Sequence, residues 1–412
     1  MINACRAELV ALCAALVAAP SVNPPGDTRA AAEVLARFLA SKGIAPEIAA
    51  CVPHKPNVLA SLEGAAGPGP HLVLNGHLDT IQPGDASAWT TPLHALTERD
   101  GRLMGLGAGN MKGGLAALAA AFAWLHTNRA AWAGRITLAA VADETVFGPD
   151  GADWLLRTRP DLRGDMLICG EGPGSMGLAI AEKGVLWLRI AADAPPGQGM
   201  LTTRGSSAVA RLARALGGLD ALNDIQVQPP AEVACLAGTA GAHGLRLSVN
   251  IGTLQGGEFI SQRPGRAEAE VDMRVPPGLR LAQVEAIVDA VCRGVPGVSW
   301  SRIKGWDANW STPDCAPARA LSAAAVQVRG TPPPPVVRLP GSDASRWRAL
   351  GVPAVCYGPQ PTLASGPDDY VLATDLLDCA RVYADAALRC LSPAHAAASP
   401  QTAFVAQHKP PD

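Results

Sequence analysis

The stretch LVLNGHLDT, residues 72–80, decides how this chain folds. Its apolar first half is typical of a buried strand, and the strand runs through Gly76 to present His77 and Asp79 two residues apart. Because alternate side chains of an extended backbone share a face, His77 could ligate a metal ion while Asp79 accepts its other N–H. A polar strand end capped by water explains the same residues equally well.

Two further apolar runs end in carboxylates. The run 136–141 is soon followed by Glu144, and the run 166–169 is soon followed by Glu171. Ligand crevices of open α/β sheets lie at the carboxyl ends of the strands. Several polar groups delivered there together therefore indicate a site more strongly than any one of them.

A glycine-punctuated turn, GLGAGNMKGG at 105–114, opens an Ala/Leu-rich helix that we expect to reach about Leu125. Asn110 stands where the N-cap of that helix belongs, and asparagine is a favoured N-cap residue. Capping explains Asn110 without any ligand role.

In this order, the segments resemble the M20 family of zinc aminoacylases and carboxypeptidases, which includes acetylornithine deacetylase and succinyl-diaminopimelate desuccinylase. The resemblance covers nearly the whole chain. Further matching segments are SVNPPG at 21–26, GG at 256–257, DMRVPP at 272–277, GSDA at 341–344 and YGP at 357–359. In that family, two zinc ions share a bridging aspartate.

The resemblance assigns roles position by position. His77 and Glu171 match the private ligands of one zinc, and Glu144 matches the general base. Asn110 stands in place of the bridging aspartate, and a neutral amide oxygen is a poor substitute for a carboxylate toward zinc.

The other zinc site loses both of its private ligands. Thr145 replaces a glutamate and Ser365 replaces a histidine, so we expect this site to hold no metal. The remaining site could hold one ion through His77, Glu171 and, weakly, Asn110. We therefore expect at most one divalent ion, with zinc the favoured element, and a metal-free protein stays open.

Three more residues are candidates for substrate binding. Gln198 aligns with a family histidine that stabilises the oxyanion, and glutamine can still donate a hydrogen bond there. Arg274 matches an arginine that meets a substrate carboxylate in relatives, although a cation paired with a neighbouring acid is the alternative. Asp343 lies in the matching GSDA segment.

At 412 residues the chain is too long for one compact core. We expect a doubly wound α/β catalytic domain at 1–182 and 296–392, with an inserted α+β lid at 183–295. The resemblance implies that this lid forms a homodimer. The Ala/Ser/Pro-rich residues 393–412 predict a disordered tail.

Composition excludes some partners. The net charge is −2 and Lys and Arg form no dense run, which argues against nucleic acid and anionic membranes as partners. The ten cysteines include no Cys-x-x-Cys pair, so we expect buried reduced thiols and a cytoplasmic protein. The apolar stretch 9–19 matches the first helix of the family, so we interpret it as structural and not as a targeting signal.

Three functional hypotheses remain. The first is a hydrolase of an amide or related C–N bond in a small carboxylate-bearing substrate of N-acyl amino acid type, with Glu144 as general base. The second is a metal-free enzyme on the same scaffold that uses Glu144 and Asp79 for cyclisation, elimination or acyl transfer. The third is a non-catalytic relative that binds a ligand or a partner.

Overall fold

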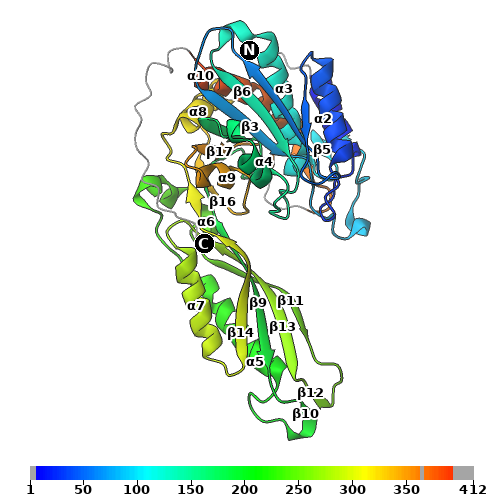
Figure 1. Cartoon of the computed structure of the whole chain (residues 1–412), viewed down its shortest axis with the longest axis vertical. Coiled ribbons are helices and arrows are strands. Elements are labelled where there is room, and N and C mark those ends of the chain that lie inside the picture. Colours follow the sequence, from blue (N-terminus) through cyan, green and yellow to red (C-terminus); the bar gives the residue numbers. More distant parts are fainter. Residues whose placement is uncertain (1–5, 362–365, 393–412) are drawn as a thin grey trace. The chain divides into compact units, whose positions relative to one another are not determined.

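The computed structural model describes residues 6–361 and 366–392 (Figure 1). Ser365 and the expected tail from Pro393 lie outside the described residues. The chain divides into two units, the first made of Met1–Ile180, Ser311–Pro335 and Ser342–Asp412, and the second of Ala181–Trp310 and Val336–Gly341.

The return to the first unit differs from the boundary expected at Pro296. It comes at Ser311, because residues 298–306 form a strand of the second unit's own sheet. The short segment 336–341 also belongs to the second unit.

The first unit is built on one mixed sheet. In spatial order its strands are β1 (Glu47–Ala49), β2 (Asn57–Glu63), β6 (Arg135–Val141), β3 (His71–His77), β7 (Met166–Cys169), β17 (Ala354–Cys356) and β8 (Leu178–Glu182), and the short strands β15 (Asn309–Trp310) and β16 (Pro335–Arg338) also pair with β8. The four strands β6, β3, β7 and β17 run parallel, while β2 and β8 are antiparallel to their neighbours. Strand β8 carries the chain into the second unit.

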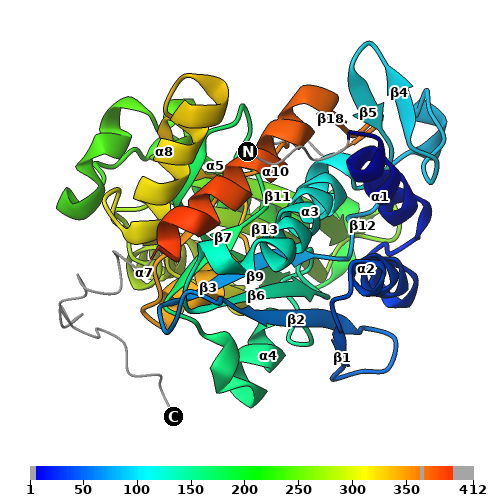
Figure 2. The ribbon, with the colours of Figure 1, turned by 90° about the horizontal axis from the view of Figure 1, so that it is seen from above.

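Helices cover both faces of this sheet. Figure 2 shows α4 (Ala152–Thr158) on one side of it, with α3 (Gly113–Thr127) and α10 (Ala373–Cys390) on the other. The remaining helices of the unit are α1 (Arg6–Ala18), α2 (Arg29–Ser41), α8 (Ala316–Arg329) and α9 (Ala344–Ala349). Helix α3 is buried almost all round, which its apolar sequence requires.

The small residues of α3 let it approach the sheet closely. A Cβ atom on Gly114 would lie 2.2 Å from the carbonyl oxygen of Gly170, the residue that follows β7. A small three-stranded sheet stands beside these elements and consists of β4 (Thr97–Arg99), β5 (Arg102–Met104) and β18 (Tyr370–Leu372).

The second unit contains a four-stranded antiparallel sheet with two helices on one face (Figure 1). The strands, in spatial order, are β11 (Ser248–Gly256), β13 (Arg266–Val275), β9 (Gly184–Asp193) and β14 (Val298–Trp306), and the helices are α5 (Ala208–Asp220) and α7 (Leu281–Arg293). Buried and partly exposed residues alternate along β13, as its sequence predicts. Helix α5 continues through Gly217 and Gly218.

These observations confirm the expected α/β fold with an inserted, separate antiparallel sheet. Every cysteine among the described residues is a free thiol, but Cys51 and Cys235 are exposed and Cys315 is half-buried, so only part of the set lies in the core. Within the described ranges, no helix is both long and apolar enough to cross a bilayer.

Candidate metal and catalytic site

Three neighbouring parallel strands of the first unit deliver polar side chains to one edge of the sheet. Strand β3 lies between β6 and β7, and the three strands lead to His77, Glu144 and Glu171 respectively. The potential ligand atoms of these three residues all lie within 4.8 Å of one another, and all three side chains are buried. The convergence expected from the sequence is therefore present in the fold.

The main chain fixes the orientation of the His77 ring. Its Nδ1 lies 2.9 Å from the carbonyl oxygen of Asp79, and a carbonyl can only accept, so Nδ1 carries the proton in the neutral ring. The Nε2 atom then faces the cluster, at 3.6 Å from Glu144 Oε2 and 3.8 Å from Glu171 Oε1. This is the tautomer that offers a lone pair on Nε2 to a cation.

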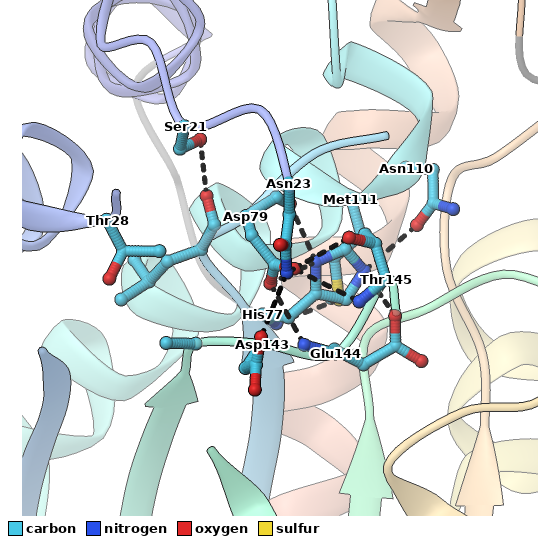
Figure 3. Close-up of polar contacts among 12 residues, drawn as sticks. Ser21, Asn23, Thr28, His77, Asp79, Asn110, Met111, Asp143, Glu144 and Thr145 are labelled. Atoms are coloured by element: carbon cyan, nitrogen blue, oxygen red, sulfur yellow. Dashed lines mark hydrogen bonds and ion pairs between the residues drawn. The ribbon is translucent and has the colours of Figure 1, made fainter. Parts of the chain in front are cut away.

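The carboxylate of Asp79 does not receive that N–H, contrary to expectation. Its Oδ1 is 3.6 Å from His77 Nδ1, whereas the two carboxylate oxygens accept other hydrogen bonds at shorter distances (Figure 3). Asn23 Nδ2 donates at 2.9 Å, the main-chain N–H groups of Glu144 and Thr145 at 3.2 and 3.0 Å, and the Thr145 hydroxyl at 2.7 Å. The carboxylate of Asp79 therefore fixes the loop after β6, and the main-chain carbonyl of Asp79 orients the His77 ring.

Asp143 turns the chain so that those N–H groups can reach Asp79. Its φ is +63°, in the left-handed region, which aspartate tolerates better than most residues. Its buried side chain accepts from Lys55 Nζ at 2.7 Å and from Asn23 Nδ2 at 3.1 Å. The loop that carries Glu144 is thus held from both sides.

Asn110 is not the N-cap of α3. The helix begins at Gly113 and its N-cap position is Lys112, while Asn110 has a non-helical φ of −125° and ψ of 97°. Its Oδ1 lies 3.0 Å from His77 Nε2 (Figure 3). The glycine-rich turn extends further than a simple cap would, and it brings the amide to the cluster.

The cluster carries surplus negative charge. Burial lowers the pKa of His77, but the carboxylates of Glu144, Glu171 and Asp79 outweigh burial and raise this pKa well above its ordinary value. A proton on the ring or a cation in the cluster would balance the same charge. Imidazole nitrogen and carboxylate oxygen are ligands that zinc accepts, so the donor set fits one divalent ion.

Thr145 and Ser365 were the expected substitutions at a second metal. The Thr145 hydroxyl donates to Asp79. Among the described residues, the side chains close enough together to hold a metal ion are those of His77, Glu144 and Glu171. Ser365 lies outside the described residues.

Asp343 lies in a buried polar position close to the cluster. It is 5 % exposed, and its Oδ2 is 3.4 Å from Asn75 Nδ2 on β3. Burial raises the pKa of Asp343 to about 7, with Glu171 contributing and His77 opposing. Asp343 therefore interacts electrostatically with the same charges that surround His77.

The other two candidates for substrate binding belong to the second unit. Gln198 is exposed on the short strand β10 (Gly197–Gln198), which pairs with β12 (Gln262–Arg263). Arg274 lies on β13 with its Nε 2.8 Å from Asp272 Oδ1, and its side chain is 22 % exposed. The acid pairing considered as the alternative for Arg274 is present, and the substrate role of both residues stays a prediction.

Two supporting residues could not be identified as part of the site from the sequence. Asn23 joins Asp79 to Asp143 from an N-terminal turn, and Met111 Sδ lies 3.2 Å from the main-chain nitrogen of His77. Asn23 stands in the SVNPPG segment that carries part of the resemblance, which was the available signal. Nothing in the sequence distinguishes Met111 from an ordinary core methionine.

Comparisons with known proteins identify the family of the chain. Residues 73–389 match the family model described as peptidase family M20/M25/M40. Acetylornithine deacetylase of Pasteurella multocida (strain Pm70) is 29 % identical over 287 residues, which cover 67 % of this chain and 70 % of that protein. Succinyl-diaminopimelate desuccinylase of Paracoccus denitrificans (strain Pd 1222) is 34 % identical over 150 residues, 34 % of this chain and 39 % of that one.

Among solved structures, an M20 family metallo-carboxypeptidase from Sulfolobus solfataricus, Sso-CP2, has the same fold. The TM-score is 0.75 at 16 % sequence identity, and the alignment covers 93 % of this chain and 99 % of that one.

Proposed function

This chain belongs to peptidase family M20/M25/M40 and is a hydrolase of that family, and we propose that it cleaves an amide or related C–N bond in a small, carboxylate-bearing substrate of N-acyl amino acid type. The observation that carries the proposal is the convergence of His77, Glu144 and Glu171 at the carboxyl ends of three parallel strands. The names of the relatives, a deacetylase and a desuccinylase, support an acyl group on nitrogen.

We further propose that the site holds at most one divalent ion, zinc for preference. His77 Nε2, a Glu171 oxygen and the Asn110 amide oxygen would hold it. Such an ion supplies Lewis-acid polarisation of a carbonyl and acidifies water. The commitment of the Thr145 hydroxyl to Asp79 supports a single ion, because that side chain is directed to a different partner.

In this proposal, Glu144 is the general base. Its carboxylate is buried, 6 % exposed, and lies 3.6 Å from His77 Nε2, so it is close to any group bound at the cluster. A carboxylate held there can take a proton from attacking water and pass it to the leaving nitrogen. Asp79 acts indirectly, since its main-chain carbonyl sets the His77 tautomer and its carboxylate holds the Glu144 loop.

Replacing Glu144 with glutamine tests this assignment. We expect kcat on N-acetyl or N-succinyl amino acids to fall about 10²- to 10⁴-fold, measured by release of the free amine, with bound metal retained. Glu63→Gln, at an exposed residue on β2, is the matched control and should leave kcat unchanged. Unaltered activity in Glu144→Gln would exclude the base role.

Metal content tests the second part of the proposal. Elemental analysis of purified protein should give no more than one equivalent of divalent ion per chain, and chelation should abolish turnover until the ion is restored. Two tightly held equivalents would contradict the single-ion site. Full activity after complete chelation would instead support a metal-free acid–base reaction on this scaffold.

We also propose that the chain forms a homodimer through the second unit. Strand β11 is at the edge of its sheet, and it exposes Leu254 (62 %) and Ile251 (37 %). Exposed apolar side chains on an unpaired edge strand favour pairing with another copy. Light scattering should show a dimer that Leu254→Glu dissociates, while Ile303→Glu on the opposite edge strand β14 leaves it intact. A monomeric parent protein would refute the proposal.

A further inference from the structure

The second unit contains a surface cavity of about 290 Å³ formed by a single hairpin. The hairpin stem is held by main-chain hydrogen bonds from Val227 to Leu245 and from Leu247 to Ile225, each 2.9 Å long. Its loop carries the 3₁₀ helix η7 (Ala231–Gly238) and the short helix α6 (Gly241–Gly244), which Figure 1 labels. The cavity lies between the stem and this loop, so every lining residue comes from one segment of the chain.

The lining of the cavity has a polar part and an apolar part. Gln226, Gln228 and Arg246 supply the polar groups of the stem, and Ala237 and Ala240 belong to the apolar part. Neither aspartate nor glutamate is among the lining residues that the structure describes. The cavity therefore combines hydrogen-bond donors and one positive charge with a small apolar surface.

Arg246 is the unusual member of this lining. It is half-buried, its Nε is fully buried, and its guanidinium makes neither a hydrogen bond nor an ion pair with any described residue. Two other arginines of the same unit are paired with acids, Arg189 with Glu270 at 2.8 Å and Arg302 with Glu285 at 3.0 Å. Because a buried N–H without an acceptor is costly, the Nε–H of Arg246 suits the cavity to a ligand that supplies an acceptor.

The charges around Arg246 favour an anion. The buried Lys183 donates from Nζ to the Arg246 carbonyl at 2.6 Å and to Ser248 Oγ at 3.1 Å. Burial, together with the positive charges of Arg274 and Arg246, lowers the pKa of Lys183 to about 8. Lys183 is committed to these acceptors, so Arg246 is the one cation that lines the cavity among the described residues.

We propose that this cavity binds one small monocarboxylate. The planar guanidinium of Arg246 offers a fork of N–H donors that matches a carboxylate bidentately. The side-chain amides of Gln226 and Gln228 hydrogen-bond a further polar atom of the ligand. The uncharged part of the ligand contacts Ala237 and Ala240. A phosphate dianion fits less well, because a single cation lines the cavity. The site consists of second-unit residues alone and does not depend on the proposed catalytic function.

The probe for this site is trifluoroacetate, observed by ¹⁹F NMR in the presence of the full chain. We expect the parent protein to broaden the trifluoroacetate signal, and the uncharged analogue trifluoroacetamide to be broadened much less. Arg246→Met should weaken binding about tenfold or more, because a charge-assisted pair is lost. Trifluoroacetate that binds at the cluster of His77, Glu144 and Glu171 broadens the signal equally in every variant. The difference in broadening between variants therefore reports the cavity alone.

Two further variants keep the test decisive. Ala237→Phe fills the cavity from an exposed lining position and should also abolish the Arg246-dependent broadening, so it carries the test if Arg246→Met fails to fold. Arg189→Met removes an arginine of the second unit that does not line the cavity, so this variant should bind trifluoroacetate as the parent does. Equal broadening by the parent, Arg246→Met and Ala237→Phe would overturn the proposal, as would equal broadening of the neutral analogue. Inorganic phosphate that displaces trifluoroacetate more strongly than acetate does would overturn the assignment to a carboxylate.

Discussion

Thr145 directs its hydroxyl at Asp79, with 2.7 Å between Oγ1 and Oδ2, and its main-chain nitrogen lies 3.0 Å from the same oxygen. The carboxylate of Asp79 is fully buried and needs these donors. Thr145 thus stabilises the loop behind the cluster.

Thr145→Val should therefore destabilise the protein. It leaves the buried Asp79 carboxylate without one short hydrogen bond, at a cost of about 1 to 3 kcal/mol in the free energy of unfolding, measured by urea denaturation. Thr145→Ser keeps the hydroxyl and should lose less than half as much. Equal losses in the two variants would show that the methyl group, and not the hydrogen bond, matters.

Metal affinity should depend on the charge at position 110. Asn110→Asp places a carboxylate 3.0 Å from His77 Nε2 and should tighten zinc binding by about tenfold or more, because an anionic ligand replaces a neutral one. Glu171→Gln should weaken it by a similar factor. Competition with a chromophoric chelator measures both. Zinc affinity unchanged in both variants would place the ion elsewhere.

Gly114 should tolerate no side chain. A Cβ atom there would come within 2.2 Å of the Gly170 carbonyl, which is main chain and cannot move aside without shifting the adjacent Glu171. We expect Gly114→Ala to destabilise the fold by about 2 kcal/mol or more and to weaken metal binding. In Gly217→Ala, within α5, nothing lies within 4 Å of the new atom, so this control should gain up to about 1 kcal/mol.

His71 should make stability sensitive to acid. Burial lowers the pKa of His71 from 6.5 to about 4, with Arg135 contributing. The unfolded chain therefore binds this proton first, so the stabilising contribution is complete above pH 6.5 and is lost as the pH falls from 6.5 through 4. Allowing for partial solvent exposure, the loss is about 1 to 2 kcal/mol.

The check is the difference in unfolding free energy between the parent and His71→Gln as a function of pH. This difference should shift in favour of the variant on acidification from pH 6.5 to 4. His94→Gln, at an exposed histidine, should follow the parent across the same range. A parallel pH profile for His71→Gln and the parent would contradict the prediction.

Much of the fold could be predicted because its strands are continuous apolar runs. The strands that end at His77 and before Glu171 were expected within a residue of where they lie, since parallel strands buried on both faces have an unmistakable composition. The end of the second unit could not be placed, because β14 is an edge strand whose exposed and half-buried residues carry no apolar run. Local propensity is also an incomplete guide, since α5 continues through Gly217 and Gly218 although glycine is a poor helix former.

The sequence by itself determined the order of chemical groups along the chain: His77, Asn110, Glu144 and Glu171, each placed where a local element begins or ends. Only the tertiary structure decided which atoms meet. It assigned His77 Nδ1 to the carbonyl of Asp79 instead of the carboxylate, and it turned Asn110 away from a helix cap toward the ring. Hydrogen bonds between residues distant along the chain depend on how closely strands and turns pack, and no local pattern of residues encodes that spacing.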